Sequence, residues 1–261
     1  MLLLKKRVWI ALVLFLSLIL ILRAIPAGWF VFFVQQSVPG LKVQGVSGTL
    51  WQGEIDNSIV QERGGAFPLG AISWSLSPLS LLTLTPCIDM SARAAPQTIV
   101  GEACYGLFSG EVSLSDTTLS LPLANISPLL EVDVRGNIDG QITDFLWDGQ
   151  RFNNADARLL WRDAQINNGS QWIALGDIQA RSNATEDGNL TARWSTAAGD
   201  QPQGLTIQLN TLLSDIATEA RVQVDGTIGI TNQTRSLRPM LQFIGNEVSS
   251  NTFRINMNEP L

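Results

Sequence analysis

The chain has 261 residues, 45% of them hydrophobic, with 17 basic and 23 acidic residues and a formal net charge of −6 at pH 7. This length suffices for one large domain or two small ones, and the acidic balance argues against nucleic-acid binding. The absence of histidine excludes Ser-His-Asp and Cys-His catalysis and every histidine-ligated metal site.

The first 34 residues are predicted to form a short cytoplasmic stub and a transmembrane anchor. Basic residues 5–7 precede an apolar run from Val8 to Leu22, and Arg23 follows it. A bilayer core about 30 Å thick needs roughly 20 helical residues. The span therefore has to continue to Ala27, with Arg23 snorkelling toward the lipid headgroups.

The alternative for this segment is a cleaved signal peptide, whose hydrophobic region is about 7–15 residues long. No small-x-small cleavage site follows the run, which favours a retained anchor. Since no acidic residue occurs before Glu54, the positive-inside rule places the N-terminus in the cytoplasm and residues 35–261 on the other side. Four of the 17 basic residues lie at or before Arg23, so 13 remain against 23 acidic ones and that domain carries about −10.

Two tryptophan-containing segments follow the anchor. Residues 45–53 read GVSGTLWQG, which predicts a tight strand turn with Trp51 between Gly48 and Gly53. Residues 72–82 read ISWSLSPLSLL, which predicts a strand through Trp74 and then a turn of helix started by Pro78. For the tryptophans beyond the anchor, packing within a sheet is favoured over a carbohydrate- or lipid-contacting surface.

The two cysteines, Cys87 and Cys104, are predicted to form a disulfide. A hairpin centred on residues 95–96 places them directly opposite each other. The same register places Asp89 against Glu102, which is mildly unfavourable. Two unrelated buried thiols are the alternative, and a metal site is disfavoured because two cysteines without histidine do not complete a tetrahedral shell.

The remainder alternates between apolar and polar residues with a period of two. The pattern is clearest in residues 131–143, 205–210 and 219–230, and it predicts an antiparallel sheet that is covered on one face. Short helical pieces are expected only at 125–130 and 211–218. The fold class is therefore mainly β: an N-terminal transmembrane helix and a twisted antiparallel sheet or sandwich-like domain over residues 35–261.

A V-x-G-x-[LI] pattern recurs about every 90 residues, starting at Val46, Val134 and Val224. If it reflects duplication, the domain consists of two similar sheet units with a sub-boundary near residues 123–130. The same spacing also arises easily by chance in β proteins.

The sequence contains few candidates for catalytic or metal-binding residues. The acidic residues lie on polar strand faces or in turns, where solvation is their ordinary role, and the spacing of Asp133, Asn137 and Asp139 does not fit a calcium loop. We therefore expect no enzymatic activity, no catalytic residue, no metal and no cofactor.

The two segments that contain Trp51 and Trp74 resemble the N component of the bacterial type II (general) secretion pathway. The short basic N-terminus, the anchor, the length and the acidic domain also fit this family. The resemblance implies an accessory protein of the Gram-negative inner membrane with a periplasmic domain, which takes part in exporting folded proteins across the outer membrane. It implies other subunits of the apparatus as partners and assigns no catalytic residues or small-molecule substrate.

A protein of another class remains as the alternative. An anchored sheet with one apolar face is also typical of AsmA-like envelope proteins, which bind or transfer lipid in an apolar β-groove. The two hypotheses differ in structure, because a groove needs apolar strand faces left uncovered, whereas a sandwich covers them.

Overall fold

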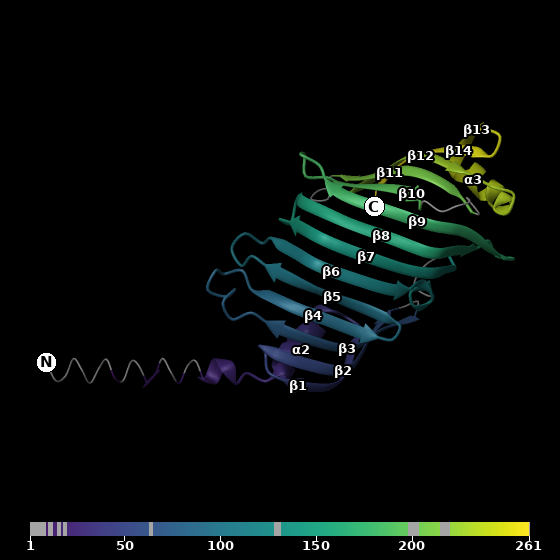
Figure 1. The fold of residues 1–261 in the computed structure, drawn as a ribbon. Coiled ribbons are helices and arrows are strands. Elements are labelled where there is room, and N and C mark those ends of the chain that lie inside the picture. The colour runs from purple at the N-terminus through teal and green to yellow at the C-terminus, as the bar shows by residue number, and fades with distance from the viewer. Residues whose placement is uncertain are drawn as a thin grey trace.

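A computed structural model describes residues 9, 13–14, 17, 20–62, 65–127, 132–197, 204–214 and 220–260. Its strands form one 14-stranded antiparallel sheet, which is twisted and curved (Figure 1). The strands are β1 (Leu41–Gly48), β2 (Gln52–Glu62), β3 (Gly65–Leu76), β4 (Cys87–Ala94), β5 (Gln97–Tyr105), β6 (Val112–Pro122), β7 (Val134–Trp147), β8 (Phe152–Asn167), β9 (Trp172–Ala184), β10 (Leu190–Thr196), β11 (Thr206–Ser214), β12 (Arg221–Gly229), β13 (Gly245–Ser249) and β14 (Thr252–Pro260).

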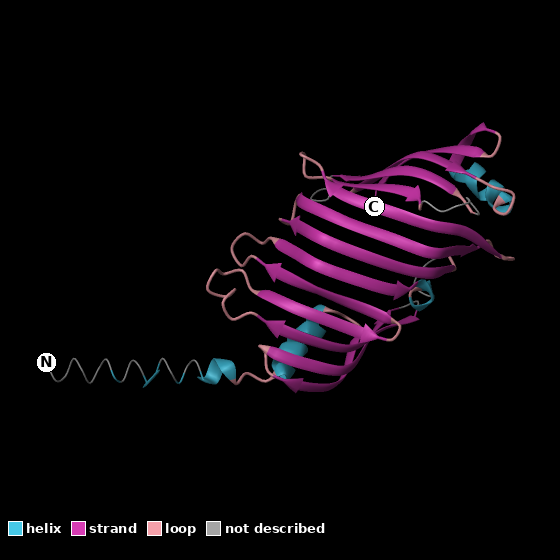
Figure 2. Cartoon of the chain, viewed as in Figure 1, coloured by secondary structure: helices cyan, strands magenta, loops and turns pink. Residues whose placement is uncertain are grey.

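Helices are short in the described part of the chain (Figure 2). They are α2 (Ala27–Ser37), α3 (Arg238–Ile244) and the 3₁₀ turns η1 (Leu123–Asn125) and η3 (Arg235–Leu237). A predominantly β fold built on an antiparallel sheet is therefore confirmed.

The strands pair almost entirely in chain order. Strands β1 to β12 lie side by side in chain order, and only the end departs from this rule, because β14 lies between β12 and β13 and pairs with both. The sheet consequently has two edges, β1 and β13. The chain passes from β6 to β7 through η1, and these strands pair directly, so the sheet continues across the expected sub-boundary.

The strand register produces one apolar face and one polar face. Reading straight across from β2 to β14, one row is Ile55, Ile72, Ala92, Ile99, Leu119, Gly140, Leu159, Ala180, Trp194, Leu209, Gly226 and Ile255. The preceding or following residue of each strand gives the next row, and it faces the other way. That row is Glu54, Ser73, Ser91, Val100, Thr118, Gln141, Arg158, Arg181, Arg193, Asn210, Asp225 and Asn256.

The apolar face is covered at its two ends. At the N-terminal end, Ala27 and Val31 of α2 pack with Ile55 and Trp74. At the C-terminal end, a larger cluster includes Ile173, Ile207, Leu237, Leu241 and Phe253, contributed by strands, η3 and α3. On the central strands, Ile99, Leu119 and Leu159 are only half-buried. The second sheet of a sandwich is absent from the described residues, so that part of the expectation is wrong.

The repeated pattern has a shared structural element. Gly136 and Gly226 both have positive φ angles, +115° and +150°. A Cβ atom at either position would lie within 2.5 Å of a carbonyl oxygen on the neighbouring strand, that of Arg162 or Gln208. Glycine is therefore required at this position in both strands. This requirement alone accounts for the recurrence of the pattern, with or without duplication of the chain.

Two expectations about helices need correction. Residues 211–214, expected as helix, form the end of β11 because each pairs with a residue of β12; tertiary pairing outweighs their local preference. Pro78 begins a series of turns rather than a turn of helix. The other expected piece, 125–130, lies partly outside the described residues and overlaps η1 at Asn125.

The expected anchor is only partly described. Val8 and most of the run to Leu22 lie outside the described residues, and those that are described contain no helix of the length and hydropathy that crossing a membrane requires. The helical conformation of residues 20–23 ends before Pro26, because a proline disfavours the α conformation in the residue before it. A continuous helix as far as Ala27 is therefore not formed.

Candidate functional site

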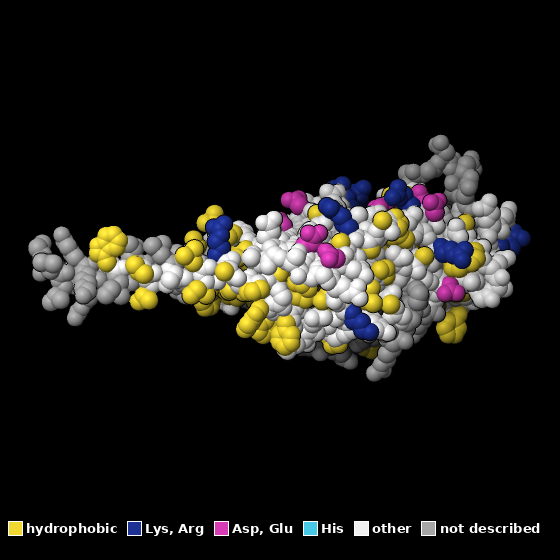
Figure 3. All heavy atoms as spheres, turned by 90° about the horizontal axis from the view of Figure 1, so that it is seen from below, with side chains coloured by type: hydrophobic (Ala, Val, Ile, Leu, Met, Phe, Trp, Pro, Cys, Tyr) yellow, Lys and Arg dark blue, Asp and Glu magenta, His cyan; other side chains and the backbone are white. Residues whose placement is uncertain are grey.

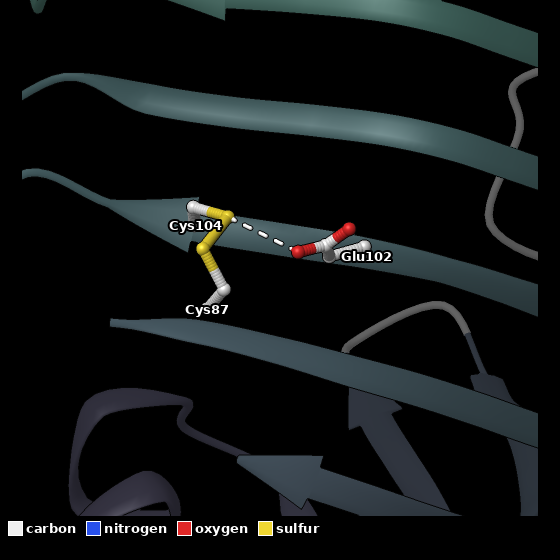
Figure 4. A group of neighbouring side chains, drawn as sticks. All are labelled: Cys87, Glu102 and Cys104. Carbon is white, nitrogen blue, oxygen red and sulfur yellow. Dashed lines mark hydrogen bonds between the residues drawn. A yellow bond between two sulfur atoms is a disulfide. The ribbon is translucent and has the colours of Figure 1, made fainter. Parts of the chain in front are cut away.

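The two cysteines form the disulfide Cys87–Cys104 at one end of the β4–β5 hairpin (Figure 4). The expected register is present, including Asp89 opposite Glu102. Glu102 also makes this the one cluster among the described residues that has metal-ligand spacing. Both sulfurs are used in the disulfide and have no thiolate to offer, so the cluster is unsuited to a metal.

Trp74 closes the N-terminal core beneath α2. It is 4% exposed, its indole N–H donates to the carbonyl oxygen of Leu50 at 3.1 Å, and its ring lies 5.4 Å from that of Phe30. Gly53 leaves room for the ring, because a Cβ atom there would lie 2.2 Å from Trp74 Cζ2. Trp74 is thus a packing residue whose ring is not available to a partner.

Trp51 links the sheet to the N-terminal segment. Its indole N–H donates to the carbonyl oxygen of Leu22 at 2.8 Å. The backbone N–H of the neighbouring Leu50 donates to the carbonyl oxygen of Ile25 at 2.9 Å. Thr49 in the β1–β2 turn also forms an isolated antiparallel β-bridge with Pro26. Gly48 ends β1 and Gly53 lies in β2, so the motif residues hold this turn against the segment that carries Leu22 and the exposed Arg23.

The outward face of α2 carries exposed aromatic side chains. Trp29, Phe32 and Phe33 are 66%, 57% and 59% exposed, while Ala27 and Val31 on the opposite side are buried. Figure 3 shows hydrophobic side chains gathered along the N-terminal extension and the adjoining end of the domain. No charged residue occurs between Arg23 and Lys42 in the sequence, so this face is suited to an apolar environment rather than to water.

Strand β1 is the longer of the two sheet edges. It pairs with β2 along one side, and the described backbone contacts on its other side occur near its ends, at Leu41 and Thr49. At the opposite edge β13 is short and carries a bulge, features that hinder further pairing. Strand β1 therefore offers the better template for an additional strand.

The polar face is divided by charge. Arg158, Arg181 and Arg193 lie directly opposite one another on β8, β9 and β10, and they make no ion pair with any described residue. Arg181 and Arg193 line a groove of about 750 Å³, to which one acidic residue, Asp225, also contributes. A second groove of about 560 Å³ near β1–β6 is lined by the acidic residues Glu54, Asp89, Glu102 and Asp116. The net charge of the sequence conceals this separation.

Acidic residues on turns have structural roles where their contacts are described. Asp148, in the β7–β8 turn, accepts hydrogen bonds from the backbone N–H groups of Gln150 and Arg151 at 2.9 and 2.7 Å. These bonds lower the pKa of its carboxyl group below the usual value, because they favour the ionised form. The turn is thereby fixed without any catalytic arrangement.

Sequence reasoning located the disulfide and the residues around Trp74 but missed three surfaces. The edge role of β1 depends on the order of strands in space, which alternation does not reveal. The arginine row joins residues 35 positions apart in the chain, and only the register brings them together. For α2, the aromatic spacing at 29, 32 and 33 was a usable signal once Pro26 is taken as a helix start.

Comparison with known proteins gives a consistent result. A family model described as "Type II secretion system (T2SS), protein N" matches residues 39–256. The chain is similar to the type II secretion system protein N of Vibrio cholerae serotype O1, with 26% identity over 144 residues, which are 53% of this chain and 56% of that protein. The match thus spans about half the length of that curated relative. No solved structure matches the chain.

Proposed function

Because the chain belongs to the family of type II secretion system protein N, we propose that it is an accessory component of that system, held at the inner membrane and acting through protein contacts in the periplasm. The observation that carries this proposal is the family match over most of the sheet domain, which also confirms the resemblance of the Trp51 and Trp74 segments. The family is a component of a secretion system and not an enzyme class.

The membrane part of the proposal is supported by the N-terminal sequence and by α2. The apolar run from Val8 to Leu22 follows three basic residues, an arrangement typical of an anchor with a cytoplasmic N-terminus. The exposed aromatic side chains of α2 follow this run in the sequence and lie next to the sheet domain. Trp51 and Leu50 hold the domain close to that segment through their hydrogen bonds.

The contact part of the proposal rests on the free edge of β1. Strand addition supplies main-chain hydrogen bonds without special side chains, which suits a domain with no histidine and a single lysine beyond Arg23. The N–H of Leu41 points away from β2, toward the carbonyl oxygen of Val38. By the two-residue period of a strand, the N–H of Val43 points the same way.

This orientation gives a direct test. The Val43→Pro substitution removes one outward N–H group of β1 and leaves the donors that face β2, so we expect weaker crosslinking to other subunits and reduced secretion. Val43→Ala is the matched control, because it shortens the same side chain and retains the N–H group. Secretion and crosslinking yields in a strain lacking the wild-type gene are measured for each variant, with thermal unfolding as a check on folding.

Equal secretion and crosslinking with the two folded variants would exclude strand addition at β1. A deletion that leaves secretion of every exported protein unchanged would reject the proposed function as a whole.

A second candidate function is favoured by the uncovered centre of the apolar face. Ile99, Leu119 and Leu159 are half-buried between the two covered ends, as a lipid-binding sheet requires. In that case phospholipid co-purifies with the full chain, and deletion changes outer-membrane permeability while secretion continues. Replacing Leu119 with Glu then abolishes lipid recovery, whereas in the secretion hypothesis, in which the anchor alone holds lipid, the Leu119→Glu variant recovers as much lipid as the wild-type chain.

A further inference from the structure

Two neighbouring loops expose large apolar side chains at one end of the sheet. They are the β3–β4 loop, residues 77–86, and the β5–β6 loop, residues 106–111. Leu79 and Leu82 of the first are 74% and 80% exposed, and Leu107 and Phe108 of the second are 53% and 85% exposed. We call these four residues the apolar tip.

The two loops are fastened to each other. The disulfide Cys87–Cys104 joins the strands directly beneath them. The backbone N–H of Leu107 donates to the carbonyl oxygen of Leu84, and that of Tyr105 to the carbonyl oxygen of Pro86, each at 3.0 Å. The apolar tip is therefore one surface with a fixed arrangement, and not two independent loops.

The polar groups of the β3–β4 loop are largely satisfied within the loop. The Ser80 hydroxyl donates to the carbonyl oxygen of Ser77 at 2.6 Å and accepts from the N–H of Cys87 at 2.9 Å. The Thr83 hydroxyl donates to the carbonyl oxygen of Ser80, and the N–H groups of residues 82, 84 and 85 find carbonyl partners in the same loop. Residues 77–86 include no charged side chain. Such a loop loses little when it leaves water.

The apolar tip lies at the same end of the strands as the N-terminal segment. In an antiparallel sheet of this order, the β1–β2, β3–β4 and β5–β6 connections all fall at one end. The β1–β2 turn is the one that binds Leu22 and Ile25. Figure 2 shows these loops on the same side of the domain as the short helical turn of residues 20–23.

We infer that the apolar tip inserts into the interfacial layer of the membrane in which the N-terminal segment is anchored. The inference rests on the proposed membrane attachment and adds a second contact to it. A bilayer is the favoured occupant because the four side chains are largely exposed, the β3–β4 loop is uncharged, and the turn at the same end of the strands binds the apolar N-terminal segment. Leucine and phenylalanine side chains gain by entering the acyl boundary. The strands then point away from the bilayer, with the β4–β5 and β8–β9 turns farthest from it.

The test uses the full chain reconstituted in vesicles of phosphatidylethanolamine and phosphatidylglycerol. Single cysteines at Phe108→Cys, Ser170→Cys and Leu14→Cys are labelled with an environment-sensitive fluorophore; the native cysteines are held in their disulfide. Position 170 lies in the β8–β9 turn at the opposite end, and position 14 reports on the anchor. We expect doxyl-labelled lipid to quench the fluorophores at 108 and 14 at least threefold more strongly than the one at 170.

The outcomes separate the two proposals. Strong quenching at 14 together with equal, weak quenching at 108 and 170 overturns the apolar-tip inference and leaves the anchor intact. Weak quenching at all three positions, with vesicles that float without the protein, refutes membrane attachment itself. Because the label at Phe108 replaces a residue of the apolar tip, a second label is placed at Ser109→Cys, which keeps all four tip residues. The Leu79→Ser/Leu82→Ser variant with this label is compared with the same labelled chain without the two serine substitutions. Loss of at least half of the quenching is expected, and an unchanged signal contradicts insertion.

Discussion

Gly53 and Trp74 show how one residue without a side chain determines the packing of another. The Trp74 ring occupies the space where a Cβ atom of residue 53 would be. We therefore expect Gly53→Ala to displace the ring, lose its hydrogen bond to Leu50 and lower the free energy of unfolding by about 1–3 kcal/mol. Urea unfolding of the full chain in detergent, followed by tryptophan fluorescence, measures the change.

Gly28→Ala is the matched control for this substitution. Gly28 lies in α2, and a Cβ atom there meets nothing within 4 Å. Since alanine favours helix over glycine by roughly 1 kcal/mol, this variant is expected to be as stable as the wild type or slightly more so. If the two variants unfold at the same urea concentration, steric crowding by Trp74 is not what requires glycine at position 53.

At the residue scale, the sequence predicts a contact correctly where the two residues lie on the two strands of a single hairpin. Cys87 and Cys104 are equidistant from the Ala95–Pro96 turn, so their pairing follows from hairpin geometry alone. The row of Arg158, Arg181 and Arg193 depends on two turns at once. The register shifts in the β8–β9 pair cancel, since the register that pairs Asn167 with Trp172 also pairs Arg158 with Arg181, so the row is found only when both the β8–β9 and the β9–β10 turns are placed correctly.

At the scale of elements, the disulfide-bonded β4–β5 hairpin is expected to be a stabilising unit. Replacing both cysteines by serine should lower the free energy of unfolding by about 3 kcal/mol, because the unfolded chain gains the entropy of an open loop. Thermal unfolding with and without reductant measures this difference, and the double serine variant should not respond to reductant.

The same variant has a second expected effect. Without the disulfide, the loops that hold Leu82 and Phe108 should be cleaved faster by a protease of broad specificity. Alkylation of native protein without reductant should label neither cysteine. Labelling of both would show that the hairpin is reduced in the cell.

Elements with regular alternation were predictable, and those defined by tertiary context were not. Val222 and Val224 alternate with polar residues, and they form β12 as the pattern indicates. Residues 211–214 contain two successive leucines, which obscure the period, and their pairing with β12 makes them strand. Helix α3 is only seven residues long, and its position is set by packing of Leu241 against the C-terminal core.

For the whole molecule, we expect the chain to stay attached to the inner membrane with the sheet domain in the periplasm. Alkaline phosphatase fused after Leu261 should be active and should sediment with membranes, since the enzyme folds only outside the cytoplasm. As a control, the same fusion after Arg7 should be inactive. Active, full-length fusion protein in the soluble periplasmic fraction would show that the anchor is not retained.

The global arrangement was the least predictable aspect of the sequence. Alternation shows that one face of the sheet is apolar, but it does not show what covers that face. A second sheet, two short helical caps or a lipid all satisfy the same pattern. Here α2 and α3 cover the two ends of the apolar face. Both helices are too short and too weakly periodic for the sequence to show which strands they cover.

The pairing of strands in chain order has a consequence for how the protein forms. Since each hairpin from β1 to β12 needs only the strand before it, loop-closure entropy stays small and the sheet is able to grow from the N-terminus as the polypeptide is synthesised and translocated. Every intermediate exposes its newest strand as an edge that is prone to mispairing. Because β14 inserts beside β12 and β13 folds outside it, completion of the C-terminus replaces this growing edge by the short, bulged β13, so truncated or stalled chains should be the aggregation-prone species.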